Sequence, residues 1–131
     1  MLPGVWYATW PRRAVARPEA TERDRWLAAV GALPGVLAYR VEVLRGAQRQ
    51  LSAPIGHADC IFVARGVVVA VEWKSDRGRQ SDGQRAWQRA WEAAGGVYLL
   101  ARDAGQCCRD LSAATGYPLA KVAESLDVKK V

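Results

Sequence analysis

The hydrophobic pattern that organises this chain lies between Gly56 and Lys74, where two apolar runs flank the dipeptide Arg65-Gly66. Apolar runs on either side of a two-residue turn signal predict a β-hairpin. The second run, Val67–Trp73, is apolar at consecutive positions until Glu72, which is typical of a central strand covered on both faces. The hairpin is therefore expected to form the middle of a β-sheet.

The rest of the chain shows helical and extended patterns on both sides of this hairpin. Apolar stripes at helical spacing, turn signals and capping residues place the other elements. In chain order we expect a helix over 18–30, a strand over 36–44, the two hairpin strands, a helix over 84–94, a strand over 97–101, a helix capped by Asp103 to about 114, and a short last helix over 117–126. We write this order as α-β-β-β-α-β-α, an α/β fold with a mixed central β-sheet flanked by helices.

Residues 1–17 form an N-terminal arm ahead of the first predicted helix. Prolines interrupt this stretch, so we expect it to be irregular. Its aromatic residues, Trp6, Tyr7 and Trp10, can pack either on the domain or on a partner subunit. With 131 residues, half of them hydrophobic, the chain is long enough for a real core, so residues 1–131 are expected to be a single domain.

The predicted hairpin brings three charged side chains to one face of the sheet. If Arg65 and Gly66 are the turn, facing residues have numbers that sum to 131, and Asp59 lies opposite Glu72. Alternation along a strand then places Lys74 on the same face as both carboxylates. Facing Cβ atoms lie roughly 4.5–5.5 Å apart, and like charges at that distance are destabilising. Two carboxylates so placed favour a divalent cation between them or a shared proton.

Charge and cysteine content narrow the partner and the compartment. The net charge is +6 and the chain holds six tryptophans. A small basic domain of this kind suggests a polyanionic partner such as nucleic acid, although a basic proteome gives the same composition. Three cysteines fit no disulfide frame or zinc spacing, which favours a reducing compartment. The sequence shows no signal peptide and no apolar run of about 20 residues, so we expect no membrane association.

The set Asp59, Glu72 and Lys74 suits metal-dependent hydrolysis of a phosphodiester. A cation held by two carboxylates polarises a phosphate oxygen and lowers the pKa of a bound water. Lys74 is placed to orient that water or to stabilise charge on phosphorus. The backbone carbonyl of Trp73, which lies between the two side chains, is a candidate third ligand. Glu-x-Lys alone also occurs at solvated strand ends, and it is the pairing with Asp59 that favours a site.

Three motifs in this order resemble the VRR-NUC branch of the PD-(D/E)xK nuclease superfamily. That branch shows Gly-x-x-Asp, then apolar-Glu-x-Lys, then Gly-x-x-Ser-x-x-Gln before an amphipathic helix, and these stand here at 56–59, 71–74 and 78–84. The resemblance covers roughly residues 18–102, since Gly95-Gly96 and a strand follow the helix as in the family. One departure is that His57 and Ala58 replace the more usual residues before the aspartate, including the proline of the superfamily name.

The resemblance implies a Mg²⁺- or Mn²⁺-dependent DNA endonuclease with a nuclease-like core. In it Asp59 and Glu72 would be metal ligands, Lys74 the catalytic lysine and Gln84 the glutamine carried by the helix. The resemblance further suggests branched or structured DNA in replication or repair, a phage or prophage gene, and the cytoplasm of a bacterial or phage-infected host cell. One small domain offers few surfaces for choosing such DNA, so we expect a homodimer.

The superfamily often adds an acidic residue from the first helix to the metal ligands. Glu22 is the candidate here and Glu19 is the alternative, since no local motif distinguishes them. Two other functions compete with this interpretation. One is a Holliday junction resolvase in the narrow sense, and the other is a non-catalytic DNA-binding module on the same fold.

Polar and basic residues around the predicted site are candidates for contact with DNA. The set comprises Arg77, Arg79, Ser81, Arg85 and His57. Each has a structural alternative: exposed arginines are often only solvated, a lone histidine is more often structural, and a serine three residues before a glutamine matches a helix capping box. The tryptophans of the predicted helices are expected in the core rather than as platforms for bases: Trp26, Trp87 and Trp91.

Overall fold

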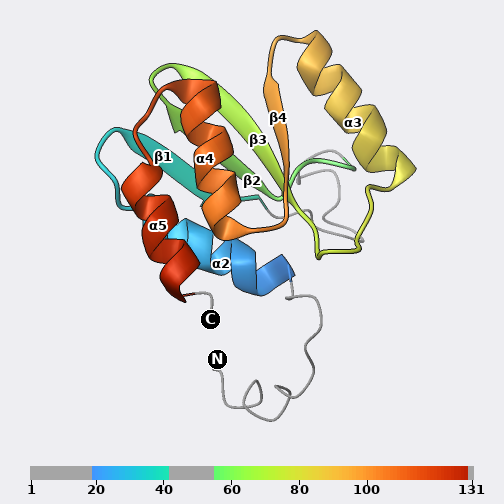
Figure 1. The fold of residues 1–131 in the computed structure, drawn as a ribbon. Helices are drawn as coiled ribbons and strands as arrows, with labels where there is room; N and C mark the ends of the chain where they lie inside the picture. The colour runs from blue at the N-terminus through green and yellow to red at the C-terminus, as the bar shows by residue number, and fades with distance from the viewer. Residues whose placement is uncertain (1–18, 42–54, 130–131) are drawn as a thin grey trace, which may run out of the picture.

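A four-stranded mixed β-sheet and four helices make up the computed structural model, which describes residues 19–41 and 55–129 (Figure 1). The elements, in chain order, are α2 (Glu19–Val30), β1 (Val36–Arg40), β2 (Cys60–Ala64), β3 (Val67–Trp73), α3 (Asp82–Ala93), β4 (Val97–Ala101), α4 (Ala104–Thr115) and α5 (Ala120–Lys129). The strands lie in the order β1-β2-β3-β4, antiparallel except for the parallel pair β3 and β4. The sheet thus contains both antiparallel and parallel pairs, which confirms the mixed sheet predicted from the sequence. Helix α3 connects the two parallel strands.

The register of the central hairpin is also confirmed. Cys60 pairs with Val71 and Ala64 pairs with Val67, so facing residues sum to 131 as predicted. Arg65 and Gly66 have φ angles of 52° and 79°. Positive φ at both central residues is the signature of a type I′ turn, whose twist matches that of the strands it joins. The turn therefore sets the register that brings Asp59 towards Glu72.

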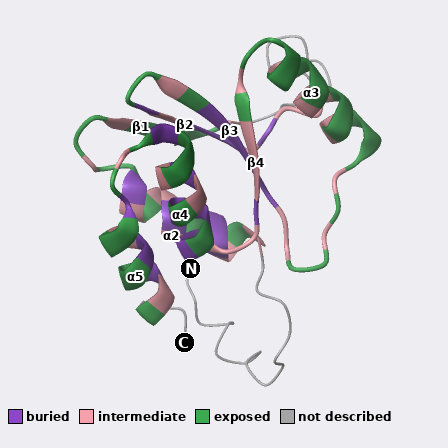
Figure 2. Ribbon diagram, turned by 45° about the horizontal axis from the view of Figure 1, so that its top comes forward, coloured by how far each residue is buried: buried purple, intermediate pink, exposed green. Residues whose placement is uncertain are grey.

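Alternation along the strands separates two hydrophobic clusters, one on each face of the sheet. Phe62 and Val71 belong to the larger cluster, where they pack with Trp26 beneath α2, α4 and α5. Ile61 and Ala70 point to the other face and belong to a smaller cluster that includes both tryptophans of α3. Figure 2 shows buried residues concentrated in the central strands and in α2 and α4, while α3 carries no fully buried residue. The side of the sheet that holds Glu72 is thus the thinly covered one.

Most of the predicted elements are present, with small differences in their bounds. The two helices predicted after the last strand are α4 and α5, so the element order is α-β-β-β-α-β-α-α, one helix longer than the order written from the sequence. Helix α3 begins at Asp82, two residues earlier than predicted, because Ser81 is its N-cap. The arm over 1–17 and the predicted strand end over 42–44 lie outside the described residues. Within the described ranges, no helix is long and apolar enough to cross a membrane.

Gly56 couples the hairpin to α3 by a close backbone contact. Its φ angle is 87°, a left-handed conformation that favours glycine. A Cβ atom placed there would lie 2.3 Å from the carbonyl oxygen of Gly83 in the first turn of α3. The segment that leads into Asp59 therefore lies directly against the helix that carries Gln84.

We expect Gly56→Ala to destabilise the protein far more than Gly66→Ala. Both glycines have a positive φ, but a Cβ at Gly66 would have no other atom within 4 Å. Gly66→Ala should therefore cost only backbone strain, about 1–2 kcal/mol, whereas Gly56→Ala adds a clash with the backbone of α3. Urea unfolding of both variants measures the difference. Equal losses of unfolding free energy would contradict the close packing of Gly56 on α3.

Candidate functional site

Asp59 lies immediately before β2, where the chain enters its pairing with β3. Its carbonyl oxygen accepts a hydrogen bond from the Val41 N–H at 2.7 Å, so its backbone still pairs on the β1 side. On the β3 side its side chain makes the hydrogen bond in place of its backbone: Oδ2 accepts from the backbone N–H of Trp73 at 2.9 Å. The N–H and C=O of one strand residue point to the same neighbouring strand. The Trp73 carbonyl therefore points to the side on which Asp59 lies.

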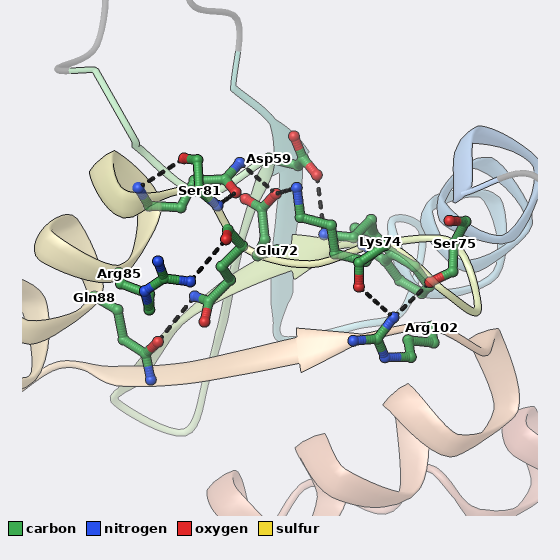
Figure 3. A network of polar contacts seen from close by, with 12 residues as sticks. Asp59, Glu72, Lys74, Ser75, Ser81, Arg85, Gln88 and Arg102 are labelled. Carbon is green, nitrogen blue, oxygen red and sulfur yellow. Dashed lines mark hydrogen bonds and ion pairs between the residues drawn. The ribbon is translucent and has the colours of Figure 1, made fainter.

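Glu72 is a buried carboxylate, with a residue exposure of 1%. Its Oε2 lies 3.4 Å from Nζ of Lys74 and accepts a hydrogen bond from Nε2 of Gln84 at 2.9 Å. Its Oε1 is buried and has no hydrogen-bond partner among the described residues. Figure 3 shows Asp59, Glu72 and Lys74 gathered at one end of the β2–β3 pair. The structure therefore brings together the three residues that the hairpin register predicts.

The electrostatic environment makes Glu72 hard to ionise. Burial is the larger cause, and the neighbouring Asp59 carboxylate is the next; together they raise the pKa of Glu72 from 4.5 to about 7, against the opposing effect of Lys74. An unpaired lone-pair oxygen in a buried site costs free energy unless it finds a donor or a cation. The site is thus a carboxylate that favours an added proton or an added positive charge.

Gln84 joins the helix to the site through both ends of its amide. Its side-chain Oε1 accepts a hydrogen bond from the backbone N–H of Ser81. The backbone N–H of Gln84 donates to the Ser81 hydroxyl, which completes a capping box. Its Nε2 is then directed at Glu72. The capping box and a hydrogen bond to Glu72 are therefore both present, and the part of Gln84 in catalysis stays a prediction. Ser81 serves as the N-cap, and its contact with DNA stays a prediction.

The loop between β3 and α3 contains a residue contact that the sequence analysis missed. Arg102, just after β4, reaches backbone carbonyls of the loop over 75–78 and is held there by several hydrogen bonds. Because β3 and β4 are parallel, the residues that follow the two strands meet at one edge of the sheet. Arg102 follows β4 as Lys74 follows β3, but the sequence does not show that these two strands are neighbours.

The predicted DNA-contacting arginines differ in the hydrogen bonds and ion pairs that they make within the protein. Arg77 and Arg79 are exposed, and within the described part of the chain neither has a hydrogen-bond or ion-pair partner. Arg85 donates to the Gln80 carbonyl at 2.8 Å and pairs with Asp82, so its guanidinium is used by its own loop and helix.

His57 lies beside the site but makes structural contacts. Its ring packs on Trp87 with 4.4 Å between ring centroids. Its Nδ1 lies 2.8 Å from the Ala58 carbonyl, which can only accept, so Nδ1 carries the proton in this arrangement. The segment over 57–58 is not strand, so the predicted register, in which facing numbers sum to 131, does not extend to His57 and Lys74. A role in DNA contact stays a prediction for this residue.

The acidic candidates from the first helix occupy different environments. Glu22 is buried: its Oε1 accepts from the Ala104 N–H at the start of α4, and its Oε2 pairs with Arg25. Its carboxylate thus supports the packing of α2 on α4, on the other face of the sheet from Glu72. Glu19 is the last of the causes that raise the pKa of Glu72, after burial and Asp59. The choice between Glu22 and Glu19 as the acidic neighbour of the site stays a prediction.

The three cysteines belong to the larger hydrophobic cluster, on the other face of the sheet from Glu72. All three are buried and form no disulfide bond. Burial raises the pKa of Cys60 and of Cys108 to about 12, and that of Cys107 well above its ordinary value, so the thiols are poor nucleophiles. Over 19–41 and 55–129, no three His, Cys, Asp or Glu side chains converge on a common point that would hold an ion.

The donor set at Glu72 nevertheless fits a hard divalent cation. Mg²⁺ is commonly bound by one or two carboxylates, with water and substrate oxygens completing its shell, so three convergent acidic side chains are not required. Glu72 contributes a buried oxygen that has no hydrogen-bond partner among the described residues, and Asp59 contributes a second carboxylate. The backbone carbonyl of Trp73 points to the side on which Asp59 lies. These residues would hold the cation if it binds.

The fold and the site together define a mixed α/β protein with a buried carboxylate, an aspartate and a lysine at one edge of its sheet. No protein-family model matches this chain, and neither a curated protein nor a solved structure matches it. Its function is accordingly inferred from the site geometry.

Glu72→Gln should stabilise the metal-free protein at pH 8 and have little effect at pH 5. The pKa of Glu72 is about 7 in the folded protein and near 4.5 when unfolded, so the folded state holds the proton more tightly and stability falls as pH rises between these values. At pH 8 the variant avoids a buried charge, and we expect a gain of about 2 kcal/mol.

Urea unfolding in the presence of EDTA at both pH values measures this gain. Glu124→Gln, at an exposed position of α5, is the matched control and should show no pH-dependent difference from the wild type. A Glu72→Gln variant that is less stable than the wild type at pH 8 would show that the pair with Lys74 outweighs the burial of the charge.

Proposed function

We propose that this protein is a metal-dependent DNA endonuclease with the nuclease-like core of the PD-(D/E)xK superfamily. The observation that carries the proposal is the buried Oε1 of Glu72, which lacks a described partner and belongs to a carboxylate that stands beside Asp59 and Lys74. A solvated ion pair at a strand end would not be buried and would not leave an oxygen without a donor. The three sequence motifs that resemble the VRR-NUC branch give additional support.

The residues of this chain divide the reaction between them. Asp59, Glu72 and the Trp73 carbonyl would hold Mg²⁺ or Mn²⁺, which when bound polarises a phosphate oxygen and lowers the pKa of a water. Gln84 keeps the Glu72 carboxylate in one orientation through its 2.9 Å hydrogen bond. Lys74, with only 16% of its side chain exposed, places an ammonium group beside the reacting phosphate and stabilises its developing charge.

Exposed arginines next to the site supply the contact with the DNA backbone. Arg77 and Arg79 lie on the loop that directly follows Lys74, and their guanidinium groups are available because no described residue engages them. Phosphate contacts of this kind position a nucleic acid without reading its sequence. The proposal therefore assigns cleavage to the buried set and substrate binding to the exposed loop.

The purified protein should nick plasmid DNA only with Mg²⁺ or Mn²⁺, and Asp59→Asn should abolish nicking because one metal ligand is lost. Gel electrophoresis of a supercoiled plasmid, with and without EDTA, measures this. The same metal should raise the melting temperature of the wild type but not of Asp59→Asn, since only a protein with an intact site is stabilised by binding. Full activity in excess EDTA would overturn the proposal, and DNA binding without cleavage would favour the non-catalytic module.

Two variants separate the roles within that experiment. Lys74→Ala should lose nearly all cleavage and keep most of its DNA affinity. The double variant Arg77→Ala/Arg79→Ala should weaken binding and flatten its salt dependence, because fewer counterions are released. Cleavage by Lys74→Ala at the wild-type rate would remove Lys74 from the reaction.

The finer part of the proposal is a homodimer that prefers branched DNA. A single domain offers one site, whereas two copies about a two-fold axis present paired sites. Light scattering should report a dimer at micromolar concentration, and deletion of residues 1–11, which lie outside the described residues, should shift it towards monomer. Four-way or flap DNA should be cut ahead of linear duplex of equal length. A monomer that cuts linear duplex equally well would contradict this part and leave the metal chemistry intact.

A further inference from the structure

Arg102 makes the most concentrated set of backbone contacts near the candidate site. Its Nη1 lies 2.5 Å from the carbonyl oxygen of Ser75, 2.9 Å from that of Gly78 and 3.3 Å from that of Asp76. The Ser75 carbonyl also accepts from the Gly78 N–H at 3.1 Å, which closes a four-residue β-turn. Figure 3 shows the Arg102 guanidinium directed at this turn from the β4 side. Arg102 therefore holds the turn by both of its ends.

The turn in turn supports the side chain of Lys74. A Cβ atom placed on Gly78 would lie 3.4 Å from both Cβ and Cδ of Lys74, and 3.1 Å from Oγ of Ser75. The bare backbone of Gly78 thus lies against the aliphatic part of Lys74, whose Nζ reaches Oε2 of Glu72. A shift of the turn would open or close the space along the lysine and move its ammonium group.

The other end of the same loop is anchored independently. The Gln80 amide nitrogen donates to Oε1 of Gln88 at 2.9 Å and to the Tyr98 hydroxyl at 3.0 Å. The Gln80 carbonyl accepts from Arg85. Loss of Arg102 would therefore release the turn over 75–78 while Gln80 still ties the loop to α3 and β4. The effect of Arg102 is local to the turn and to Lys74.

We propose that Arg102 is a positioning residue that acts on Lys74 through the turn over 75–78. The inference rests on the proposed nuclease function and deepens it, since it names a residue that touches neither the metal ligands nor the substrate. All three contacts come from one nitrogen, Nη1, so the role depends on the length of the arginine side chain, which carries that nitrogen to the carbonyls of the turn. Charge alone does not explain the contact, because all three acceptors are neutral carbonyls.

Arg102→Lys tests the proposal because it keeps the charge but shortens the side chain by one bond, so that the ammonium group should not reach the three carbonyls. We expect faster amide hydrogen exchange over residues 76–80 and a fall of about 10- to 100-fold in the single-turnover cleavage rate, as misplaced catalytic groups produce. The Kd for the same DNA, measured with Ca²⁺ in place of Mg²⁺, should stay within about threefold because the net charge is unchanged. Arg109→Lys is the matched control: Arg109 pairs with Asp127 far from the site and should change none of these values.

Gly78→Val provides a second test in which Arg102 is untouched. Its Cβ alone would lie 3.1 Å from Oγ of Ser75 and 3.4 Å from Cβ and Cδ of Lys74, so the two further methyl groups would crowd the lysine from the side of the turn. We expect the same pattern as for Arg102→Lys, a slower cleavage rate with Kd retained. This variant carries the test if Arg102→Lys fails to fold.

Three results would overturn the proposal. Unchanged amide exchange in Arg102→Lys would show that the turn does not depend on Arg102. An unchanged cleavage rate would show that Lys74 does not depend on the turn. A rise in Kd that accounts for the whole loss of activity would make Arg102 a DNA contact instead. If the wild type itself cleaves no DNA, the nuclease function is overturned, and amide exchange still decides whether Arg102 holds the turn.

Discussion

A buried carboxylate beside a second carboxylate is the constraint on which the rest of the site depends. Glu72 lies in the central strand with one oxygen bound by Lys74 and Gln84 and the other without a described partner. Burying such a charge is costly unless it is compensated. The lysine two residues on and the glutamine at the start of α3 give partial compensation, and the raised pKa of Glu72 shows what remains. The protein thus keeps an incompletely neutralised site in a structured part of the sheet.

Close backbone packing holds the elements around that carboxylate in place. Gly56 lets the segment before Asp59 lie against the first turn of α3, and Gly78 lets the loop after Lys74 lie against the lysine stem. A side chain at position 56 would clash with the backbone of α3, and a bulky one at position 78 would crowd Ser75 and the lysine stem. The glycines of the motifs at 56–59 and 78–84 therefore have a physical reason in this fold. They allow the aspartate, the lysine and the glutamine to approach one carboxylate from separate elements.

The face of the sheet that holds Glu72 is covered less completely than the opposite face. Helices α2, α4 and α5 bury the larger cluster, whereas α3 has no fully buried residue and packs through its two tryptophans. Hydrogen bonds from Arg102, Gln80 and Arg85 order the loop between β3 and α3. Because those contacts use backbone carbonyls and neighbouring side chains, Arg77 and Arg79 stay exposed at the edge of the site.

Local patterns determined much of this protein. The type I′ turn at Arg65-Gly66 sets the hairpin register, because side chains alternate with a period of two and the turn length admits one pairing. The capping box at Ser81 and Gln84 likewise follows from four residues in sequence. The turn was sufficient to predict that Asp59, Glu72 and Lys74 share a face, whereas Gln84 was assigned to the site from the resemblance. Tertiary structure decided what depends on distant segments. It engages Glu22 at the start of α4 and places Arg102 beside the loop after Lys74. Such contacts arise from the packing of α2 on α4 and from the parallel pairing of β3 with β4, which no local period specifies.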